Sequence, residues 1–373
     1  MFKRSLQPLI ENRFFQGKSI VVIGPRQVGK TTLLRMILKN RSEKSRWLDC
    51  DDPTVRALFG VQGMADLQSL IGDSRFVVID EAQRVPDVGL VLKRMIDNFP
   101  NVQLLVTGSS SLELTSAVNE PLTGRKFEFR MFPISMPEIE QNEGLIVAKS
   151  SLDQRLIFGS YPDVVNQPAD AKERLVDLAD SYLYKDILSI EGLKRPELLH
   201  KLLRALALQL GQEVSFNELS QLLGADHKTI EKYVDLLEKS FVLFRLTGLS
   251  RNLRNELKKT KKIYFTDVGI RNAILRNFAP LALRQDVGAL WENFYISERL
   301  KSNQYKLRYV NSYFWRTTDR QEIDYIEESD GQFSLYELKS NPKAKAKFPK
   351  AFLNTYPVCE KSVVTPENYL RCL

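Results

Sequence analysis

The sequence contains little cysteine and little histidine, with three and two residues among 373. Cys50, Cys359 and Cys372 are too few and too widely spaced for a disulfide framework or a zinc cluster. This scarcity suits a reducing compartment, and we expect a cytoplasmic protein. Because His200 and His227 are the only histidines, metal catalysis by histidine ligands is nearly excluded.

Long apolar runs are absent as well. Those that exist, such as residues 76–79, have the length of a β-strand and not of a membrane helix. Residues 1–10 hold one basic pair and no apolar stretch of signal-peptide length. We therefore expect neither a membrane partner nor a secretion signal, with export by a route that needs no such signal as the alternative.

Length and charge limit the architecture and the partners. A chain of 373 residues is longer than a single hydrophobic core usually supports, so we expect two or three domains. The net charge of +8 and the pI of about 9.2 weakly favour a polyanionic partner. Residues 251–262 are either a solvated surface hairpin or a contact for nucleic-acid phosphates. Their basic members are Arg251, Arg254, Lys258, Lys259, Lys261 and Lys262, against the single acid Glu256.

Residues 1–145 alternate strand-like and helical patterns, which predicts an α/β domain. Residues 76–79 and 102–107 are apolar on both faces, as the central strands of a parallel sheet are. Residues 30–40 follow another such strand and have helical spacing. We expect a parallel sheet with helices on both sides. Other expected strands are residues 19–23, 46–49 and 126–131, with a further helix at 90–99.

The remaining chain divides into three expected regions. Residues 146–200 have helical spacing and predict a lid or linker. Residues 201–262 predict a winged-helix region, whose helix-turn-helix has Asp226 as the cap of its second helix. Residues 263–373 mix one helix with strands and predict another α/β domain. The expected elements are helices at 152–158, 171–188, 196–210, 216–223, 229–239 and 288–301, and strands at 241–246, 262–265, 313–316, 322–326, 333–338 and 362–365.

The second helix of the predicted helix-turn-helix offers exposed cationic side chains. His227, Lys228 and Lys232 are candidates for DNA contact, although Glu231 and Asp235 on the same helix weaken its positive potential. Winged helices also serve as protein interfaces, so both partners stay open. The expected core positions are Leu219, Leu222, Ile230, Val234 and Leu237.

A complete Walker A pattern follows the first predicted strand and begins a predicted helix. Its glycines allow backbone N–H groups to surround phosphate oxygens, at a helix N-terminus that favours anions. Lys30 would reach the β- and γ-phosphates of ATP, and the Thr31 hydroxyl would coordinate Mg²⁺. The alternative is a glycine-rich structural turn. The expected nucleotide-binding residues are Gly24, Pro25, Arg26, Gln27, Val28, Gly29, Lys30, Thr31 and Thr32.

Three further positions complete the predicted ATPase site. The buried strand at residues 76–79 ends in Asp80 and Glu81, a Walker B arrangement in which Asp80 holds Mg²⁺ and Glu81 polarises the attacking water. The next strand ends at Thr107, which we favour over Ser109 as the polar residue that senses the γ-phosphate; a plain turn is the alternative. Arg125 is a candidate arginine finger or sensor, or else a surface arginine.

These motifs resemble the AAA+-type ATPases of bacteria and archaea, in the branch that carries an uncharacterised C-terminal domain. The resemblance covers most of the chain and implies ATP binding with Mg²⁺. The segments that resemble this family are residues 24–34, 77–86, 105–111, 122–125, 132–135, 182–188 and 262–269.

The last third is similar to the PD-(D/E)xK nuclease core. Asp324 lies on one predicted strand, and Glu337 and Lys339 lie on the next, with a turn at Asp330 and Gly331 between them. Because alternate strand residues share a face, Glu337 and Lys339 should converge with Asp324. The two carboxylates, with Glu292 from the preceding helix as a further acid, would bind Mg²⁺, and Lys339 would assist the attacking water. The alternative is a degenerate fold with an ordinary Glu337–Lys339 surface pair.

Two functions are consistent with these patterns. The first is a DNA-directed ATPase, oligomeric or not, in which the nucleotide controls a winged helix and a nuclease-like domain. The second is a nucleotide-dependent switch that binds a protein partner and cuts nothing.

Overall fold

The computed structural model describes residues 2–60, 63–108, 122–188, 195–250, 261–317, 319 and 321–373, with the backbone alone for 181–188. The chain forms two compact units. The N-terminal unit comprises residues 2–133 with 239–241, and the C-terminal unit comprises 134–238 and 242–373. The expected domain end at residue 145 is therefore too late, because α7 (Met136–Glu143) already packs within the C-terminal unit.

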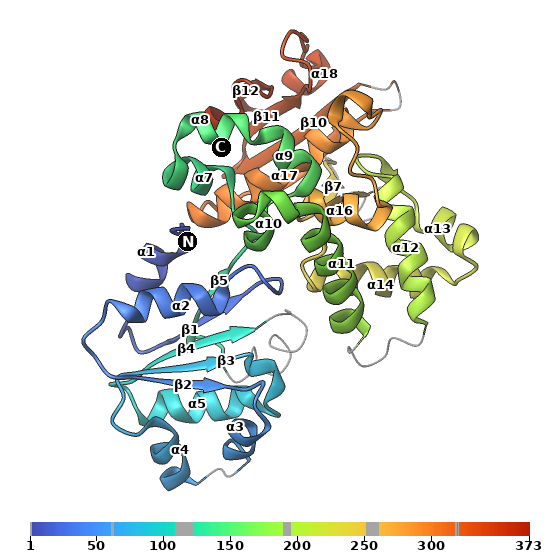
Figure 1. The fold of residues 1–373 in the computed structure, drawn as a ribbon. Coiled ribbons are helices and arrows are strands. Elements are labelled where there is room, and N and C mark those ends of the chain that lie inside the picture. The colour runs from blue at the N-terminus through green and yellow to red at the C-terminus, as the bar shows by residue number, and fades with distance from the viewer. Residues whose placement is uncertain are drawn as a thin grey trace. The chain divides into compact units, whose positions relative to one another are not determined.

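The N-terminal unit is built on one parallel five-stranded sheet (Figure 1). Its strand order is β2 (Ser45–Asp49), β3 (Phe76–Asp80), β4 (Gln103–Gly108), β1 (Ser19–Ile23) and β5 (Lys126–Arg130). Every residue of β1, β3 and β4 is buried, as their continuous apolar runs predict. Because β4 lies between β1 and β3, its carboxyl end stands between the ends of the other two strands.

Helices cover both faces of this sheet. Figure 1 shows α2 (Lys30–Lys39) on one face and α5 (Val88–Asn98) on the other. Alternate residues of the strands, such as Val77 and Ile79 of β3, pack in one cluster with Val91 and Leu92 of α5. The other elements are α1 (Leu6–Glu11), α3 (Pro53–Leu58), α4 (Met64–Ile71) and the 3₁₀ turn η1 (Ala82–Arg84).

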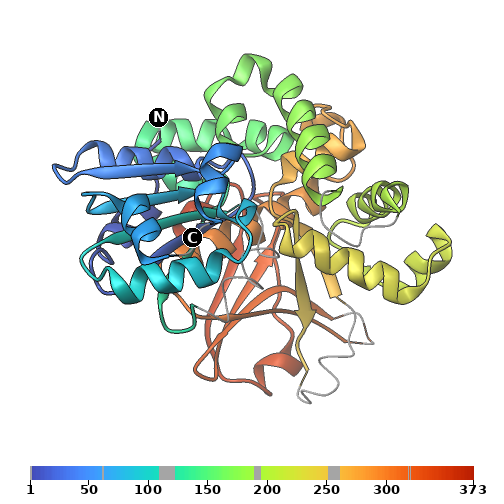
Figure 2. The ribbon, with the colours of Figure 1, turned by 90° about the horizontal axis from the view of Figure 1, so that it is seen from below.

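The C-terminal unit contains one mixed seven-stranded sheet in the order β12-β11-β10-β9-β7-β8-β6. Thr247 and Gly248 of β7 pair in parallel with β9 and join the two halves of this sheet, and Figure 2 shows the yellow strand beside the orange and red ones. The expected boundary between residues 262 and 263 falls inside β8, so the two predicted C-terminal domains share one sheet. The strands are β6 (Glu213–Val214), β7 (Leu243–Gly248), β8 (Lys261–Phe265), β9 (Asn311–Arg316), β10 (Glu322–Ser329), β11 (Gln332–Leu338) and β12 (Val358–Val364).

Helices make up the rest of this unit. The long α17 (Val287–Tyr305) has buried residues on most of its circumference, which its weak amphipathic pattern fits. No helix in the described part of the chain is long and apolar enough to cross a membrane. The other elements are α8 (Leu145–Ser150), α9 (Leu152–Phe158), α10 (Pro162–Asn166), η2 (Pro168–Asp170), α11 (Ala171–Leu188), α12 (Pro196–Leu208), α13 (Phe216–Leu223), α14 (His227–Lys239), α16 (Val268–Leu275), η3 (Leu281–Leu283), α18 (Lys350–Leu353) and η4 (Tyr369–Cys372).

The predicted helix pair forms α13 and α14. Asp226 caps α14 as expected, since its Oδ1 accepts a hydrogen bond of 2.9 Å from the Thr229 N–H. Leu222 is not a core residue: it is 66% exposed, and Leu236 is buried instead. The two strands that flank residues 251–260 are β7 and β8, and those ten residues lie outside the described part of the chain.

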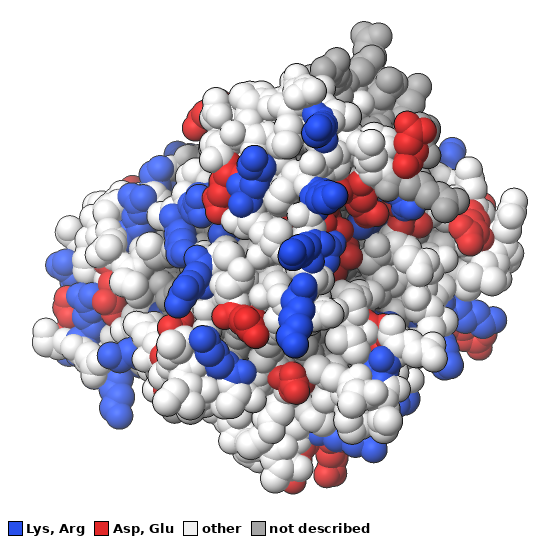
Figure 3. Space-filling view, turned by 90° about the horizontal axis from the view of Figure 1, so that it is seen from above, with Lys and Arg blue, Asp and Glu red and all other residues white. Residues whose placement is uncertain are grey.

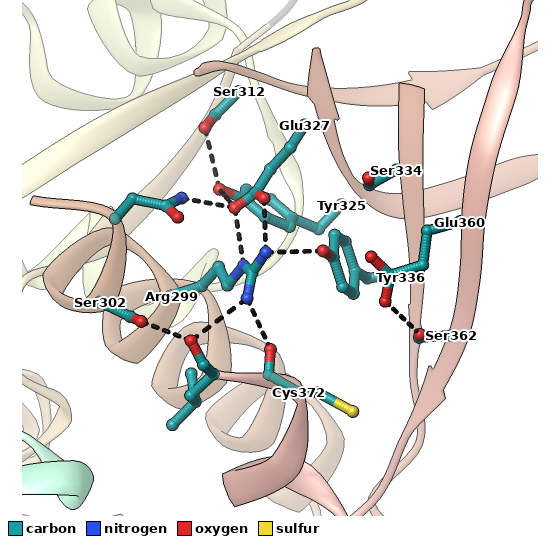
Figure 4. A network of polar contacts seen from close by, with 12 residues as sticks. Arg299, Ser302, Ser312, Tyr325, Glu327, Ser334, Tyr336, Glu360, Ser362 and Cys372 are labelled. Atoms are coloured by element: carbon teal, nitrogen blue, oxygen red, sulfur yellow. Dashed lines mark hydrogen bonds and ion pairs between the residues drawn. The ribbon is translucent and has the colours of Figure 1, made fainter. Parts of the chain in front are cut away.

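A buried polar network joins α17 to the sheet (Figure 4). The Arg299 guanidinium donates two hydrogen bonds, of 2.8 and 2.7 Å, to the Glu327 carboxylate on β10. It also donates to the Tyr336 hydroxyl at 2.7 Å and to the Cys372 carbonyl at 2.7 Å. The Arg299 guanidinium thus connects α17 to β10, β11 and η4. Its hydrogen bonds and its ion pair with Glu327 compensate for the cost of burying a charged group.

Candidate functional site

The segment between β1 and α2 forms a loop whose shape depends on its glycines. Gly29 has φ of 95°, in the left-handed region that glycine adopts readily. At Gly24 a side chain would collide with the backbone, because a Cβ there would lie 2.1 Å from the Met131 carbonyl oxygen. The loop therefore presents its backbone at the N-terminus of α2, where unpaired N–H groups favour an anion.

Lys30 is folded over this loop. Its Nζ donates hydrogen bonds of 2.9 Å to both the Gly24 and the Pro25 carbonyls, and the residue is only 5% exposed. These carbonyls hold the ammonium at the loop, where a phosphate could replace them as its partner. Among the other loop residues, Val28 is buried and Gln27 is exposed.

Asp80 lies at the carboxyl end of β3 and faces two hydroxyl groups. Its Oδ1 accepts a hydrogen bond of 3.1 Å from the Thr31 hydroxyl and a second one from the Thr107 hydroxyl. Burial raises the pKa of Asp80, and the two hydroxyl donors oppose this rise. The structure thus brings together the three predicted residues from the P-loop helix, β3 and β4.

Glu81 is oriented by its backbone and by two neighbours. Its φ of 53° lies in the left-handed region, which is uncommon for a residue other than glycine. Its N–H donates to the Thr107 hydroxyl at 3.0 Å, and its carboxylate accepts a hydrogen bond from the Gln83 side-chain amide. Thr107 therefore bonds to the Asp80 carboxylate and to the Glu81 N–H, and Gln83 is a hydrogen-bond partner of Glu81 that the sequence patterns did not indicate.

A second residue missing from the predictions is Arg4, which precedes α1. This buried guanidinium donates to the Val28 carbonyl in the loop at 2.8 Å and to the Phe132 carbonyl at 2.6 Å. Arg4 therefore links the P-loop to the chain segment that leads out of the N-terminal unit. No motif in the sequence pointed to it, because its partners are carbonyl groups far away along the chain.

Arg125 does not join these residues. It precedes β5, and its carbonyl accepts a hydrogen bond from the N–H of Ser19, the first residue of β1. The P-loop follows the other end of β1, about 16 Å away at about 3.3 Å per strand residue. The side chain forms an ion pair of 2.8 Å with Asp97. The sensor role in its own site is therefore not supported by the geometry. Ser109 lies outside the described residues.

The C-terminal unit brings Asp324, Glu337 and Lys339 together. The Asp330–Gly331 turn has φ of 52° and 78°, and it joins β10 and β11 in an antiparallel pair. The Lys339 Nζ donates to Glu337 at 2.9 Å and to Asp324 at 3.4 Å. Glu337 is 6% exposed, and its Oε1 is buried without a hydrogen-bond partner.

Glu292 belongs to the same cluster but is held by other groups. Its Oε1 accepts hydrogen bonds from the Tyr264 hydroxyl and, at 3.1 Å, from the Lys262 Nζ, which also pairs with Glu322 at 2.7 Å. Lys262 is 2% exposed, so it does not belong to a solvated basic hairpin. Burial lowers its pKa, but Glu292 and Glu322 outweigh this effect and raise it above the usual value. We call Lys262, Glu292, Glu322, Asp324, Glu337 and Lys339 the acidic cluster.

The acidic cluster partly fits a divalent cation. Burial, followed by the charge of Asp324, raises the pKa of Glu337 to about 7. A cation beside the unpaired Oε1 would remove this cost. In the described part of the chain, however, no group of three or more His, Cys, Asp or Glu side chains is placed to hold a metal ion. Two carboxylates remain, which is the number Mg²⁺ often uses when water and phosphate oxygens complete its shell.

The exposed residues predicted on α14 lie where they were expected. His227, Lys228 and Lys232 are all exposed. The acid Asp235, in contrast, pairs with Arg245 at 2.7 Å. Part of the negative charge on this helix is therefore neutralised from β7.

The parallel sheet, the P-loop and the strand that ends in Asp80 define the N-terminal unit as an AAA-type P-loop ATPase fold. Residues 16–140 match the AAA domain family. Residues 149–281 and 287–370 match two domains of unknown function, DUF8612 and DUF4143. Residues 16–140 are thus similar to AAA domains and have a P-loop ATPase fold, and residues 287–370 are similar to DUF4143 domains.

Similar proteins match most of the chain. The protein Rv2008c of Mycobacterium tuberculosis is 29% identical over 346 residues, which cover 90% of this chain and 74% of the relative. MJ1637 of Methanocaldococcus jannaschii is 23% identical and covers 83% of this chain and 73% of the relative. Both are called uncharacterized proteins. The Walker-type ATPase PABY2304 of Pyrococcus abyssi has a similar fold, with a TM-score of 0.51, 17% identity and coverage of 74% of this chain and 96% of that structure.

Proposed function

We propose that this protein binds and hydrolyses ATP at the P-loop. The observation that supports this most strongly is the arrangement around Asp80, whose carboxylate bonds to Thr31 of the P-loop helix and to Thr107 of β4. The loop amides and Lys30 bind the phosphates. Positioning and charge stabilisation are the main contributions that phosphoryl transfer requires of a protein.

Thr31 and Asp80 fit a magnesium ion. Both present oxygen atoms, which Mg²⁺ prefers, and the buried Asp80 has a raised pKa that a cation would lower. When bound, the ion would neutralise charge on the β- and γ-phosphates. Glu81 orients the attacking water, and its hydrogen bonds to Thr107 and Gln83 hold it in place for this task.

The test of the ATP site compares the full chain with Lys30→Ala. We expect the wild type to bind a fluorescent ATP analogue and to release phosphate in Mg²⁺, and Lys30→Ala to lose tight binding or turnover. Unchanged turnover in Lys30→Ala would refute the site. Lys39, at the end of the same helix, provides a matched control, because Lys39→Ala should leave binding and turnover intact.

We propose that Arg125 is an arginine finger that acts on a neighbouring chain, with an ordinary surface arginine paired to Asp97 as the alternative. Its place near the amino ends of β1 and β5, opposite the strand ends that the P-loop follows, favours this role over sensing in its own site. Mixing Arg125→Ala with Lys30→Ala chains should then restore turnover, because an intact ATP site meets an intact Arg125. A mixture as inactive as its components would reject the finger.

We further propose that DNA regulates ATP turnover, with a protein partner as the alternative. Exposed His227, Lys228 and Lys232 on α14 support this proposal. On the face shown in Figure 3, Lys and Arg side chains are interspersed with Asp and Glu side chains. The test measures the ATPase rate with and without duplex DNA at two salt concentrations. Stimulation that weakens with salt supports DNA, and its absence favours the protein partner.

A second candidate activity is metal-dependent DNA cleavage by the acidic cluster. The specific observation in its favour is the buried, unpaired Oε1 of Glu337 beside Asp324 and Lys339. Asp324 and Glu337 would hold the ion, and Lys339 would stabilise charge on the phosphate. We expect plasmid nicking in Mn²⁺ that disappears in Asp324→Ala. If the wild type never nicks DNA, the cluster has no nuclease activity.

A further inference from the structure

Lys262 occupies an unusual position for a lysine. Its stem starts on β8, and its Nζ lies 5.3 Å from the centre of the Phe314 ring on β9. The ammonium ends between Glu292 of α17 and Glu322 of β10, at 3.1 and 2.7 Å. Its side chain is 3% exposed. Such burial is costly for a lysine unless acids surround it, and here two of them do.

The charges of the acidic cluster do not balance. Four carboxylates, from Glu292, Glu322, Asp324 and Glu337, accompany the two ammonium groups of Lys262 and Lys339. When all six groups are ionised, two negative charges remain, which equals the charge of one divalent cation. Lys262 contacts Glu292 and Glu322, and Lys339 contacts Asp324 and Glu337, so each pair of carboxylates keeps one unbalanced negative charge. Of these four carboxylates, Glu337 is the one with a buried oxygen, Oε1, that has no hydrogen-bond partner, which favours Asp324 and Glu337 as the place for a cation.

We propose that the Lys262 ammonium takes the place of a second cation, so that the acidic cluster binds one divalent ion, at Asp324 and Glu337. This inference rests on the metal-binding role proposed above for those two residues. It assigns Glu292 to Lys262 and not to the metal, in contrast to the sequence expectation. It also explains why the described residues contain no group of three acids that could hold a metal.

A fixed lysine has a physical advantage over a second metal ion. Mg²⁺ gives up its water reluctantly and needs near-octahedral geometry, whereas an ammonium can donate hydrogen bonds to any two or three acceptors within reach. Lys262 therefore offsets one of the two negative charges of Glu292 and Glu322 without a metal. The contact between β8, α17 and β10 then persists in the ion-free protein, and the site at Asp324 and Glu337 remains open to one cation.

The experiment counts bound Mn²⁺ by electron paramagnetic resonance. Nucleotide-free protein with Asp80→Asn removes the P-loop site from the count. In this background we expect one bound Mn²⁺ per chain. When Lys262→Met or Lys262→Gln is added, we expect two bound Mn²⁺ per chain. When Glu322→Gln is combined with Lys262→Met, we expect the number to return to one. Lys261→Met, on the neighbouring and more exposed residue of β8, is the matched control and should bind one.

The outcomes separate this inference from the role on which it rests. If the background protein binds no Mn²⁺, the metal site at Asp324 and Glu337 is refuted. If it binds one and both Lys262 variants also bind one, that site stands and the inference about Lys262 is wrong. Should both variants fail to fold, recovery of the fold in Mn²⁺ would support the inference, because the ion would then replace the ammonium. Failure to recover would contradict it.

Discussion

Thr107→Val tests the arrangement of the ATPase site, because one hydroxyl holds both Walker B acids. Valine keeps the shape of threonine and removes this hydroxyl from a position that is 0% exposed. Asp80 then loses a hydrogen bond to a charged group, worth about 1.5–3 kcal/mol, and the Glu81 N–H loses its acceptor at 3.0 Å. We expect local destabilisation of about 2–4 kcal/mol.

Two assays measure the effect of Thr107→Val. Hydrogen–deuterium exchange at the Glu81 amide should accelerate about 30-fold for a local loss of about 2 kcal/mol. ATP turnover should fall by about 10- to 100-fold, because Glu81 no longer holds its orientation, while ATP affinity changes by less than about 3-fold. Thr107→Ser keeps the hydroxyl and is the control. Unchanged exchange and turnover in Thr107→Val would refute the positioning role of this residue.

Three further predictions follow from individual contacts. Arg4→Ala removes the hydrogen-bond donor to the Val28 carbonyl of the P-loop, at a cost of about 1.4 kcal/mol in binding free energy. ATP binding measured by fluorescent titration should therefore weaken about 10-fold, whereas Arg13→Ala, at an exposed position, should leave it unchanged. Arg299→Leu leaves Glu327 buried without its cationic partner and should cost about 3–5 kcal/mol in urea unfolding, with a smaller cost when Glu327→Leu is added. The pKa of Glu337 rises on folding from 4.5 to about 7, so the folded state binds more protons in this interval and loses stability as the pH rises through 7. In EDTA, Glu337→Gln should therefore raise Tm at pH 8 and leave it unchanged at pH 5; equal shifts at both would contradict this pKa.

The sequence predicted the strands of the ATPase sheet within one or two residues, because buried parallel strands are continuous apolar runs. It also predicted that Asp80 lies with Thr31 and Thr107, since the Walker motifs define which strand ends meet. Arg4 and Gln83 were missed for a common reason. Their functions depend on hydrogen bonds to a carbonyl or a carboxylate that only the fold brings near, and no spacing rule describes such contacts.

The C-terminal part was harder to predict. Alternation along β10 and β11 correctly predicted that Asp324, Glu337 and Lys339 converge. The charge content assigned Lys262 to a surface segment, because six basic residues within 251–262 suggested solvent or phosphate contact. Only the packing of β8 against α17 shows that this residue is buried. The prediction that Leu222 is a core residue was wrong for a similar reason. Helical periodicity identifies an apolar face, but it does not show whether another element packs against that face.

The measurement that tests the central claim most directly compares ATP binding and hydrolysis in the wild type and in Glu81→Gln. The substitution keeps the shape of the side chain and removes the carboxylate that polarises water. We expect the wild type to hydrolyse ATP in Mg²⁺, and Glu81→Gln to bind ATP with similar affinity while its hydrolysis falls by a factor of about 100 or more. Equal hydrolysis by the two proteins, or loss of ATP binding in Glu81→Gln, would contradict the assignment of Glu81 as the residue that activates water.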